Sequence, residues 1–305
     1  PGRVAASDVP PPRPRTLGLE RTRMRPTLYN EMLQARHYRG LYERLKDSAE
    51  GQTAEGKLVL YEILRQCANI TEGRRPGYRA TPPKRDDFLA GLAPTDPQRD
   101  KRIAAYEDYA ADRCGDLASL NVTEAQLNRL LGEAAALRNP QAMALSIEQD
   151  LWKNRRQGSG TISDDQVQRL KEIANTKDPE AIRVAGRVLA NSWTDYGLRI
   201  GPDQQPVESR PFVNAFLVLA CEYGAPCGAD TPRMLQACAF SGHCEADSFP
   251  DDLYYYGSSP HDSELMLSYR SLVRRAIETG DWSQINVVRG AGAAGNRMTF
   301  VPGPR

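Results

Sequence analysis

Six cysteines and three histidines are the residues of this 305-residue chain best suited to chemistry. Four of the cysteines, Cys221, Cys227, Cys238 and Cys244, form a Cx5Cx10Cx5C pattern, and His243 directly precedes the last of them. Such a cluster could ligate zinc, form disulfide bonds or hold free buried thiols. Structural zinc sites usually separate paired cysteine ligands by roughly two to four residues. The spacing of five residues therefore favours disulfides.

The other two cysteines are Cys67 and Cys114, which end the second and third predicted helices. A bond between them would join two helix ends, and closing a loop of that length stabilises a fold by about 4 kcal/mol in the chain-entropy model. Disulfides persist in oxidising compartments, so we expect a bacterial protein that is periplasmic or secreted. No signal peptide is visible from Pro1 onward, and the expectation rests on the cysteines.

Within the C-terminal cluster, the placement of the cysteines favours one pairing over others. Cys221 ends an apolar helix and Cys238 lies inside the next helix, whereas Cys227 and Cys244 lie in the glycine-containing segments that follow these helices. We therefore expect Cys221–Cys238 and Cys227–Cys244, two bonds that would cross-link one helical hairpin. Sequence alone does not determine connectivity, and tight pairs such as Cys221–Cys227 are the alternative.

Acidic residues surround the two C-terminal histidines. His243, Asp247, Asp251, Asp252 and His261 could together form a metal site or an acid–base site. The structural alternative is that loops are commonly acidic and that carboxylates early in a helix complement its dipole. This alternative explains the acidic residues, so we assign no catalytic residue, no metal and no cofactor, and keep His243 and His261 as candidate binding residues.

Three consecutive tyrosines, Tyr254, Tyr255 and Tyr256, are the second candidate for binding. Successive residues of a helix point in different directions, so at least one of the three should be exposed. Tyrosine is favoured at recognition surfaces because its rigid ring offers an amphipathic contact. The alternative is that this segment packs against the final helix.

These residues must be positioned by helices, because the apolar periodicity along the chain is helical. No convincing alternating strand is found. The predicted helices cover residues 28–48, about 53–70, about 98–114, a buried apolar stretch at 212–221, and 260–279 before Gly280.

The middle of the chain contains a faint internal repeat with a period of about 40 residues. Val122–Leu127 resembles Ile162–Val167, and each contains a capping-box pattern for a helix start. Asn139-Pro140 and Asp178-Pro179 then repeat an N-cap followed by proline at the first helical position. Such helix pairs predict an α-solenoid, and an irregular helical bundle with common caps is the alternative.

The segment from Asn139 to Leu151 and its counterpart from Asp178 to Ala190 resemble the turn and second helix of Sel1-like and tetratricopeptide-like repeats. This resemblance covers about a third of the chain. It implies a scaffold that presents a concave surface to a partner. The cysteine-bearing helix pair at 208–244 also resembles disulfide-linked Sel1-like proteins of bacterial secretions, although its spacing differs from theirs.

Composition narrows the function classes. The chain has 40 basic and 39 acidic residues, a net charge of +1, which argues against a dedicated nucleic-acid binder. The apolar stretch Phe212–Cys221 is too short to span a bilayer. The sequence has no nucleophile elbow, metalloprotease helix, phosphate-binding loop or dinucleotide-binding turn.

The sequence predicts an all-α protein whose helices are cross-linked by disulfide bonds. We expect a proline-rich lead-in at 1–17, a helical region at 18–120, a repeat-like region with the cysteine-rich hairpin at 121–285 and a glycine-rich tail at 286–305. The predicted function is a non-enzymatic binding or scaffold protein of the bacterial envelope with a protein partner. The alternative is a cell-wall-directed or other hydrolase with an acidic site near 243–264.

Overall fold

The computed structural model describes residues 27–70 and 83–290, and most of these residues are helical. The predicted lead-in and the tail from residue 291 lie outside the described residues. Among the described residues, no helix is long and apolar enough to cross a membrane. The α-helices are α1 (Leu28–Gln34), α2 (Arg39–Lys46), α3 (Ala54–Cys67), α4 (Arg85–Gly91), α5 (Arg99–Ala110), α6 (Glu124–Ala136), α7 (Pro140–Arg156), α8 (Asp164–Asn175), α9 (Pro179–Leu189), α10 (Ser209–Glu222), α11 (Pro232–Ser241), α12 (Phe249–Asp252) and α13 (Pro260–Thr279).

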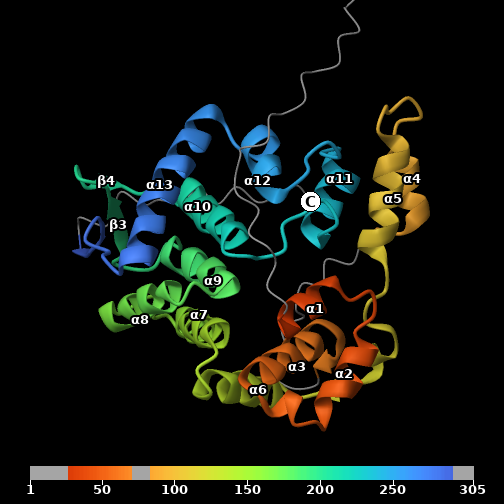
Figure 1. The fold of residues 1–305 in the computed structure, drawn as a ribbon, viewed down its shortest axis with the longest axis horizontal. Helices are drawn as coiled ribbons and strands as arrows, with labels where there is room; N and C mark the ends of the chain where they lie inside the picture. The colour runs from red at the N-terminus through yellow and green to blue at the C-terminus, as the bar shows by residue number, and fades with distance from the viewer. Residues whose placement is uncertain (1–26, 71–82, 291–305) are drawn as a thin grey trace, which may run out of the picture.

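The helices follow a curved path through the molecule (Figure 1). Contacts run from α3 to α6, then through α7 and α9 to α10 and α13. This arrangement confirms the predicted all-α class. The described residues also form the helical turns η1 (Glu50–Gln52), η2 (Gly115–Ser119) and the π-helical η3 (Leu253–Gly257).

The first core lies between α1, α2, α3 and α6. The helix expected over 28–48 is broken between α1 and α2, because the backbone N–H of Tyr38 donates to the carbonyl of Arg113 at 2.8 Å instead of to a helical carbonyl. The helix expected over 98–114 ends at Ala110, so Cys114 lies beyond it and precedes η2. Cys114 nevertheless bonds to Cys67 at the end of α3, as predicted.

The two predicted helix hairpins, α6–α7 and α8–α9, begin in the same way. Thr123 and Ser163 form full capping boxes with Gln126 and Gln166. Within each hairpin, a left-handed residue links the two helices: Arg138 has φ 64° and Lys177 has φ 60°. Asn139 and Asp178 then cap α7 and α9, each with proline next in the chain.

The second and largest core lies among α7–α10, α12 and α13, and it includes a small sheet that the sequence analysis missed. Strand β3 (Gly197–Ile200) pairs with β4 (Gln205–Pro206) on one side and β5 (Ile285–Val288) on the other, both antiparallel. A further pair, β1 (Asn69–Ile70) and β2 (Asn121–Val122), is parallel. These strands are two to four residues long, too short for an alternating pattern to stand out.

A third, smaller core forms where α4 and α5 pack against α11. Phe88 of α4 stacks on Tyr106 of α5 with ring centroids 4.2 Å apart, and Phe240 of α11 meets both rings edge-on. Helix α4 was not predicted. Because of this core, a segment from the first half of the chain lies beside a helix from the last third (Figure 1).

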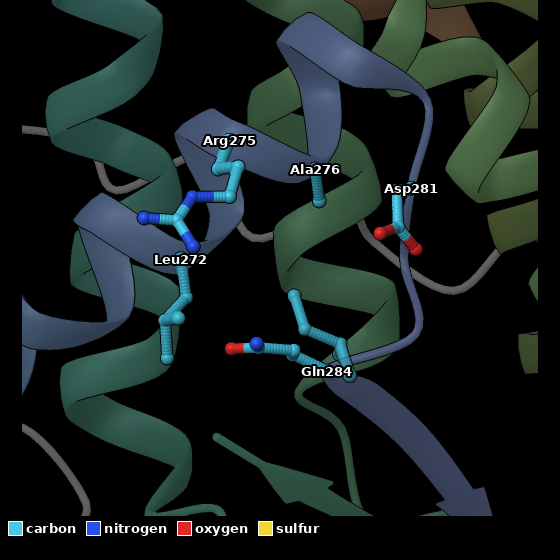
Figure 2. Close-up of a pocket in the computed structure, with 6 residues that line it drawn as sticks. Leu272, Arg275, Ala276, Asp281 and Gln284 are labelled. Atoms are coloured by element: carbon cyan, nitrogen blue, oxygen red, sulfur yellow. The ribbon is translucent and has the colours of Figure 1, made fainter. Parts of the chain in front are cut away.

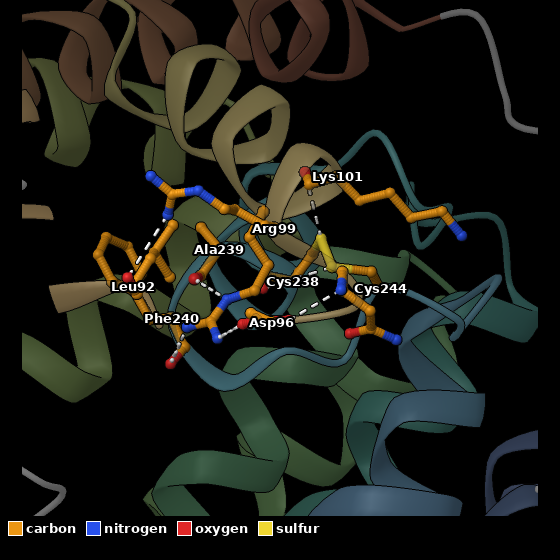
Figure 3. Close-up of polar contacts among 10 residues, drawn as sticks. Leu92, Asp96, Arg99, Lys101, Cys238, Ala239, Phe240 and Cys244 are labelled. Carbon is orange, nitrogen blue, oxygen red and sulfur yellow. Dashed lines mark hydrogen bonds and ion pairs between the residues drawn. A yellow bond between two sulfur atoms is a disulfide. The ribbon is translucent and has the colours of Figure 1, made fainter. Parts of the chain in front are cut away.

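Polar contacts complete the junction between α5 and α11 (Figure 3). The Arg102 guanidinium donates to the carbonyls of Ala239 (2.9 Å) and Phe240 (3.4 Å) at the end of α11, and also pairs with Asp96 at 2.6 Å. Lys101 pairs with Glu245 just beyond α11. A cation at these carbonyls satisfies acceptors that a helix leaves unpaired at its C-terminus.

The remaining disulfides are Cys221–Cys227 and Cys238–Cys244, so the expected pairing across a hairpin is wrong and the tight alternative is correct. The physical reason is packing. Helix α10 packs against α9 and α13, whereas α11 packs against α5, so the two helices do not form a hairpin. Each bond instead closes the loop that follows its own helix, where the chain turns at Gly224 (φ 106°) or Gly242 (φ 74°).

We expect the three disulfides to contribute unequally to stability. The Cys67–Cys114 bond spans 47 residues and each of the others spans 6. The chain-entropy model gives about 4 kcal/mol for the long loop and about 2 kcal/mol for a short one. Urea unfolding of Cys67→Ala/Cys114→Ala and of Cys221→Ala/Cys227→Ala should show this order, and equal losses would contradict it.

Candidate functional site

Two of the predicted binding residues, His243 and Tyr256, come together in the structure. The imidazole of His243 stacks on the Tyr256 ring, with centroids 4.5 Å apart and planes at 16°. His243 Nδ1 lies 2.7 Å from Oδ1 of Asp252, the last residue of α12. Asp252 is largely buried, whereas Tyr256 is 42% exposed. The Asp252 carboxylate therefore holds the His243 ring in place, and Tyr256 on the face of that ring is exposed to solvent.

Helix α12 holds Asp252 in place through its own start. Ser248 caps this short helix by accepting the backbone N–H of Asp251, and its hydroxyl donates to the buried Asp251 carboxylate at 2.5 Å. The backbone N–H of Phe249 donates to the carbonyl of Cys227 at 2.8 Å. The loop closed by Cys221–Cys227 thus contacts the start of the helix that carries Asp252.

The other two tyrosines are less exposed than Tyr256. Tyr254 and Tyr255 contact each other edge-on at 4.9 Å, and Tyr254 packs against the largest core. All three tyrosines lie in the π-helical turn η3, which turns their side chains in different directions. The prediction that at least one is exposed is confirmed by Tyr256.

His261 lies in a different environment from His243. It is in the first turn of α13, where its Nε2 lies 3.0 Å from Oε1 of Glu208, and both side chains are exposed. Glu208 raises the pKa of His261 above its ordinary value. The structure therefore does not assemble the acid–base cluster of five residues considered above, but only its His243–Asp252 pair.

An arginine that sequence reasoning missed lies beside this pair. The Arg233 guanidinium, in the first turn of α11, lies 3.7 Å from the centre of the Phe249 ring. Desolvation and the positive charge of Arg183 lower the pKa of Arg233 to about 10, although Asp252 opposes this change and the arginine side chain is exposed. Arg233 remains charged at neutral pH.

Arg183 connects this region to a set of charged groups between the two large cores. It forms an ion pair with Glu180 on α9, and burial raises the pKa of Glu180 despite that pair. Tyr29 of α1 and Glu62 of α3 interact electrostatically with both residues, and burial raises the Tyr29 pKa. Figure 1 shows α1, α3, α9 and α11 bordering the middle of the curved path. We call the set that these helices and α12 contribute, Tyr29, Glu62, Glu180, Arg183, Arg233 and Asp252, the central polar cluster.

The sequence held little signal for this cluster. Glu180 follows Pro179 at a helix start, where a carboxylate is ordinary, and Arg183 has the common spacing of a helical ion pair. Their electrostatic interactions with Tyr29 and Glu62 involve α1 and α3, more than a hundred residues earlier in the chain. Such long-range interactions are not visible in local patterns.

The donor groups do not suggest a metal site in the described part of the chain. All six cysteines form disulfides, which excludes the zinc alternative that used cysteine ligands. No group of three or more His, Cys, Asp or Glu residues is arranged to hold a metal among residues 27–70 and 83–290.

A small pocket lies between α13 and β5, away from these groups (Figure 2). Its volume is about 70 Å³, below the roughly 300 Å³ of the smallest typical ligand sites. Its lining includes Arg275 and Asp281, and it is too small for an organic substrate.

Comparison with protein-family models, with curated proteins and with solved structures finds no significant match to this chain.

We expect Glu180 to make stability depend on pH. Its folded-state pKa is raised above the ordinary value of 4.5, so its stabilising contribution is present at low pH and is lost as pH rises through the folded-state pKa. Relative to Glu180→Gln, the wild-type free energy of unfolding should therefore fall as pH increases from about 4.5.

Glu43 is the matched control for this measurement. A hydrogen bond from Lys46 lowers the Glu43 pKa, so its contribution is lost as pH falls, and Glu43→Gln should change the slope in the opposite sense. Urea unfolding of the three proteins between pH 4 and pH 8 makes the comparison. Parallel pH profiles for wild type and Glu180→Gln would refute the assignment.

Proposed function

We propose that the chain is a non-enzymatic binding or scaffold protein of the bacterial envelope that holds a protein partner. The observation that carries this proposal is the His243–Tyr256 stack. Tyr256 is exposed, while Asp252 fixes the ring beneath it through a 2.7 Å hydrogen bond. A rigid aromatic side chain loses little conformational entropy when it is buried by a partner, which is why tyrosine is enriched at binding hot spots.

The architecture and the disulfides support the proposal in separate ways. Helix hairpins arranged along a curved path offer an extended surface, the kind that helical-repeat scaffolds use for proteins. Three disulfides are consistent with an oxidising extracytoplasmic compartment. Membership of the Sel1-like or tetratricopeptide-like repeats is part of the proposal and rests on the shared turn geometry of α6–α7 and α8–α9.

Site-specific photo-crosslinking tests the partner surface. A benzophenone amino acid replaces Tyr256, and in a control protein it replaces Trp152, an aromatic residue of α7 with a similar exposure of 40%. In envelope preparations, we expect a discrete adduct of fixed mass from position 256 and none from position 152.

The partner identified in this way is then purified and titrated. Tyr256→Ala should weaken its binding at least about tenfold, the effect of a hot-spot residue, whereas Tyr256→Phe and Trp152→Ala should retain affinity. Equal adducts at both positions, or full affinity in Tyr256→Ala, would refute the proposed surface.

A hydrolase is the second candidate, and one observation favours it. Hydrogen bonding of His243 Nδ1 to a buried carboxylate orients the ring and leaves Nε2 to exchange a proton, as a general base requires. If this candidate is correct, cell-wall glycan or peptide fragments will be cleaved, and His243→Ala will lower the rate by about 10²-fold or more. His261→Ala is the control, because His261 lies outside this pair. Absence of cleavage, or equal rates in both variants, counts against a hydrolase.

A further inference from the structure

We propose that the hairpin of α4 and α5 (residues 83–110), which we call the arm, detaches from α11 while the two large cores stay folded. The attached arm orders the candidate site by fixing the end of α11, and detachment loosens the site. This inference rests on the proposed function, because it describes a regulation of the same site. Figure 1 shows the arm at the right edge of the molecule, beside α11.

The arm belongs to a loop whose base is held in place. The Cys67–Cys114 disulfide joins residues 47 positions apart, and the arm lies between them. Just beyond α5, the Arg113 guanidinium donates to the carbonyl of Leu33 at 3.0 Å. Residues 111–112, which belong to no helix, connect α5 to this base. A change of backbone angles at such a short link is enough to move a hairpin as one body.

Most of the apolar packing in the third core lies inside the arm. Among the described residues, four of the five buried side chains of this core come from the arm: Phe88, Leu92, Ala105 and Tyr106. The fifth, Ala239, is the buried contribution of α11, and the Phe240 ring beside it stays 37% exposed. The stack of Phe88 on Tyr106 moves with the arm, because both rings belong to it. Separating the arm from α11 therefore exposes less apolar surface than opening either large core.

The other attachments of the arm to α11 are polar. Arg102 donates to two carbonyls at the end of α11, and Lys101 pairs with Glu245 at 2.6 Å (Figure 3). The side chains of Lys101 and Glu245 are 60% and 47% exposed, and ion pairs this exposed add little to stability. The ion pair of Arg102 with Asp96 lies within the arm, so it persists after detachment. Water can replace the polar contacts that are lost, which keeps the detached state accessible.

Detachment acts on the candidate site through the end of α11. His243 follows Gly242, the left-handed residue with φ 74° that ends this helix. A Cβ atom on Gly242 would lie 3.6 Å from the side-chain oxygen of Gln98, so the arm lies directly against this turn. The two partners of His243 lie elsewhere, Asp252 on α12 and Tyr256 on η3. Without the arm, the turn before His243 loses its support and the ring moves relative to Tyr256.

Fluorine NMR of the full, oxidised chain tests the inference. A single 4-fluorophenylalanine replaces Phe240, whose ring meets Phe88, Tyr106 and Tyr109 of the arm edge-on. We expect the fluorine to report a second state in which these ring contacts are lost, either as a separate signal or as a displaced average. Arg102→Gln should raise the ratio of detached to attached arm about tenfold, because charge-assisted hydrogen bonds to α11 are lost.

Matched variants make this result specific. Arg169→Gln removes the same charge from an exposed ion pair on α8 and should leave the ratio unchanged. Lys101→Gln removes the exposed pair with Glu245 and should raise the ratio by a smaller factor, which also gives a reading if Arg102→Gln does not fold. One attached signal in every variant would overturn the inference, as would equal changes in Arg102→Gln and Arg169→Gln.

Two further fluorine positions separate detachment from unfolding and test the effect on the site. A label at Phe216, which is fully buried in the largest core, should keep its native signal. If it changes together with position 240, the motion is global unfolding and the arm does not detach by itself. A label at position 256 should change in proportion to the detached state, and an unchanged signal there would refute the effect on the site.

This test and the test of the proposed function can fail separately, because the fluorine experiment needs no partner. If position 256 yields no cross-linked adduct, the proposed function falls while the signals from positions 240 and 216 still decide whether the arm detaches. If an adduct forms but position 240 shows only the attached state, the partner surface stands and the detaching arm is refuted.

Discussion

The packing of α5 against α11 is the contact on which the arrangement of the candidate site depends. Helix α11 makes its most extensive contacts with α5, through Phe240 and its neighbours. Arg102 of α5 also satisfies the last carbonyls of α11. Arg233 lies at one end of α11 and His243 just beyond the other. Because α5 fixes this helix, it sets where both side chains lie relative to α9 and α12, and a contact outside the site determines its geometry.

The three carboxylates of the central polar cluster, Glu62, Glu180 and Asp252, are buried. Removing charges from water costs free energy, and ion pairs between buried charges often fail to recover that cost. The raised pKa of Glu180 agrees with this cost, because burial outweighs the attraction of Arg183. Apolar residues between the two large cores would fill the same space without this penalty.

Features governed by local rules were predictable from the sequence, and features governed by distant contacts were not. Caps and proline positions located the starts of α6 to α9, and Gly280 located the end of α13, because these signals involve a few neighbouring residues. The electrostatic interaction of Arg183 with Tyr29 and Glu62, and the packing of α11 against α5, depend on how distant helices are arranged in space. The pairing of the last four cysteines failed for the same reason, since it assumed that α10 and α11 were neighbours.

The two short disulfides, Cys221–Cys227 and Cys238–Cys244, lie beside the candidate site, so an oxidising compartment that favours these bonds also affects the geometry of the site. The Cys238–Cys244 bond closes the loop that contains His243, and the Cys221–Cys227 bond closes the loop that precedes α11. That second loop accepts the backbone N–H of Phe249 and forms a bridge between Gly228 and Ser248. Phe249 is the ring beneath Arg233, and Ser248 caps the helix that carries Asp252. Hairpin cross-links would have held two helices together, whereas these local bonds restrict the loops on both sides of the aromatic pair. Oxidation therefore acts on the site through both loops, and it also acts on the cores, because Cys221 and Cys227 pack against the largest core and Cys238 packs against the third.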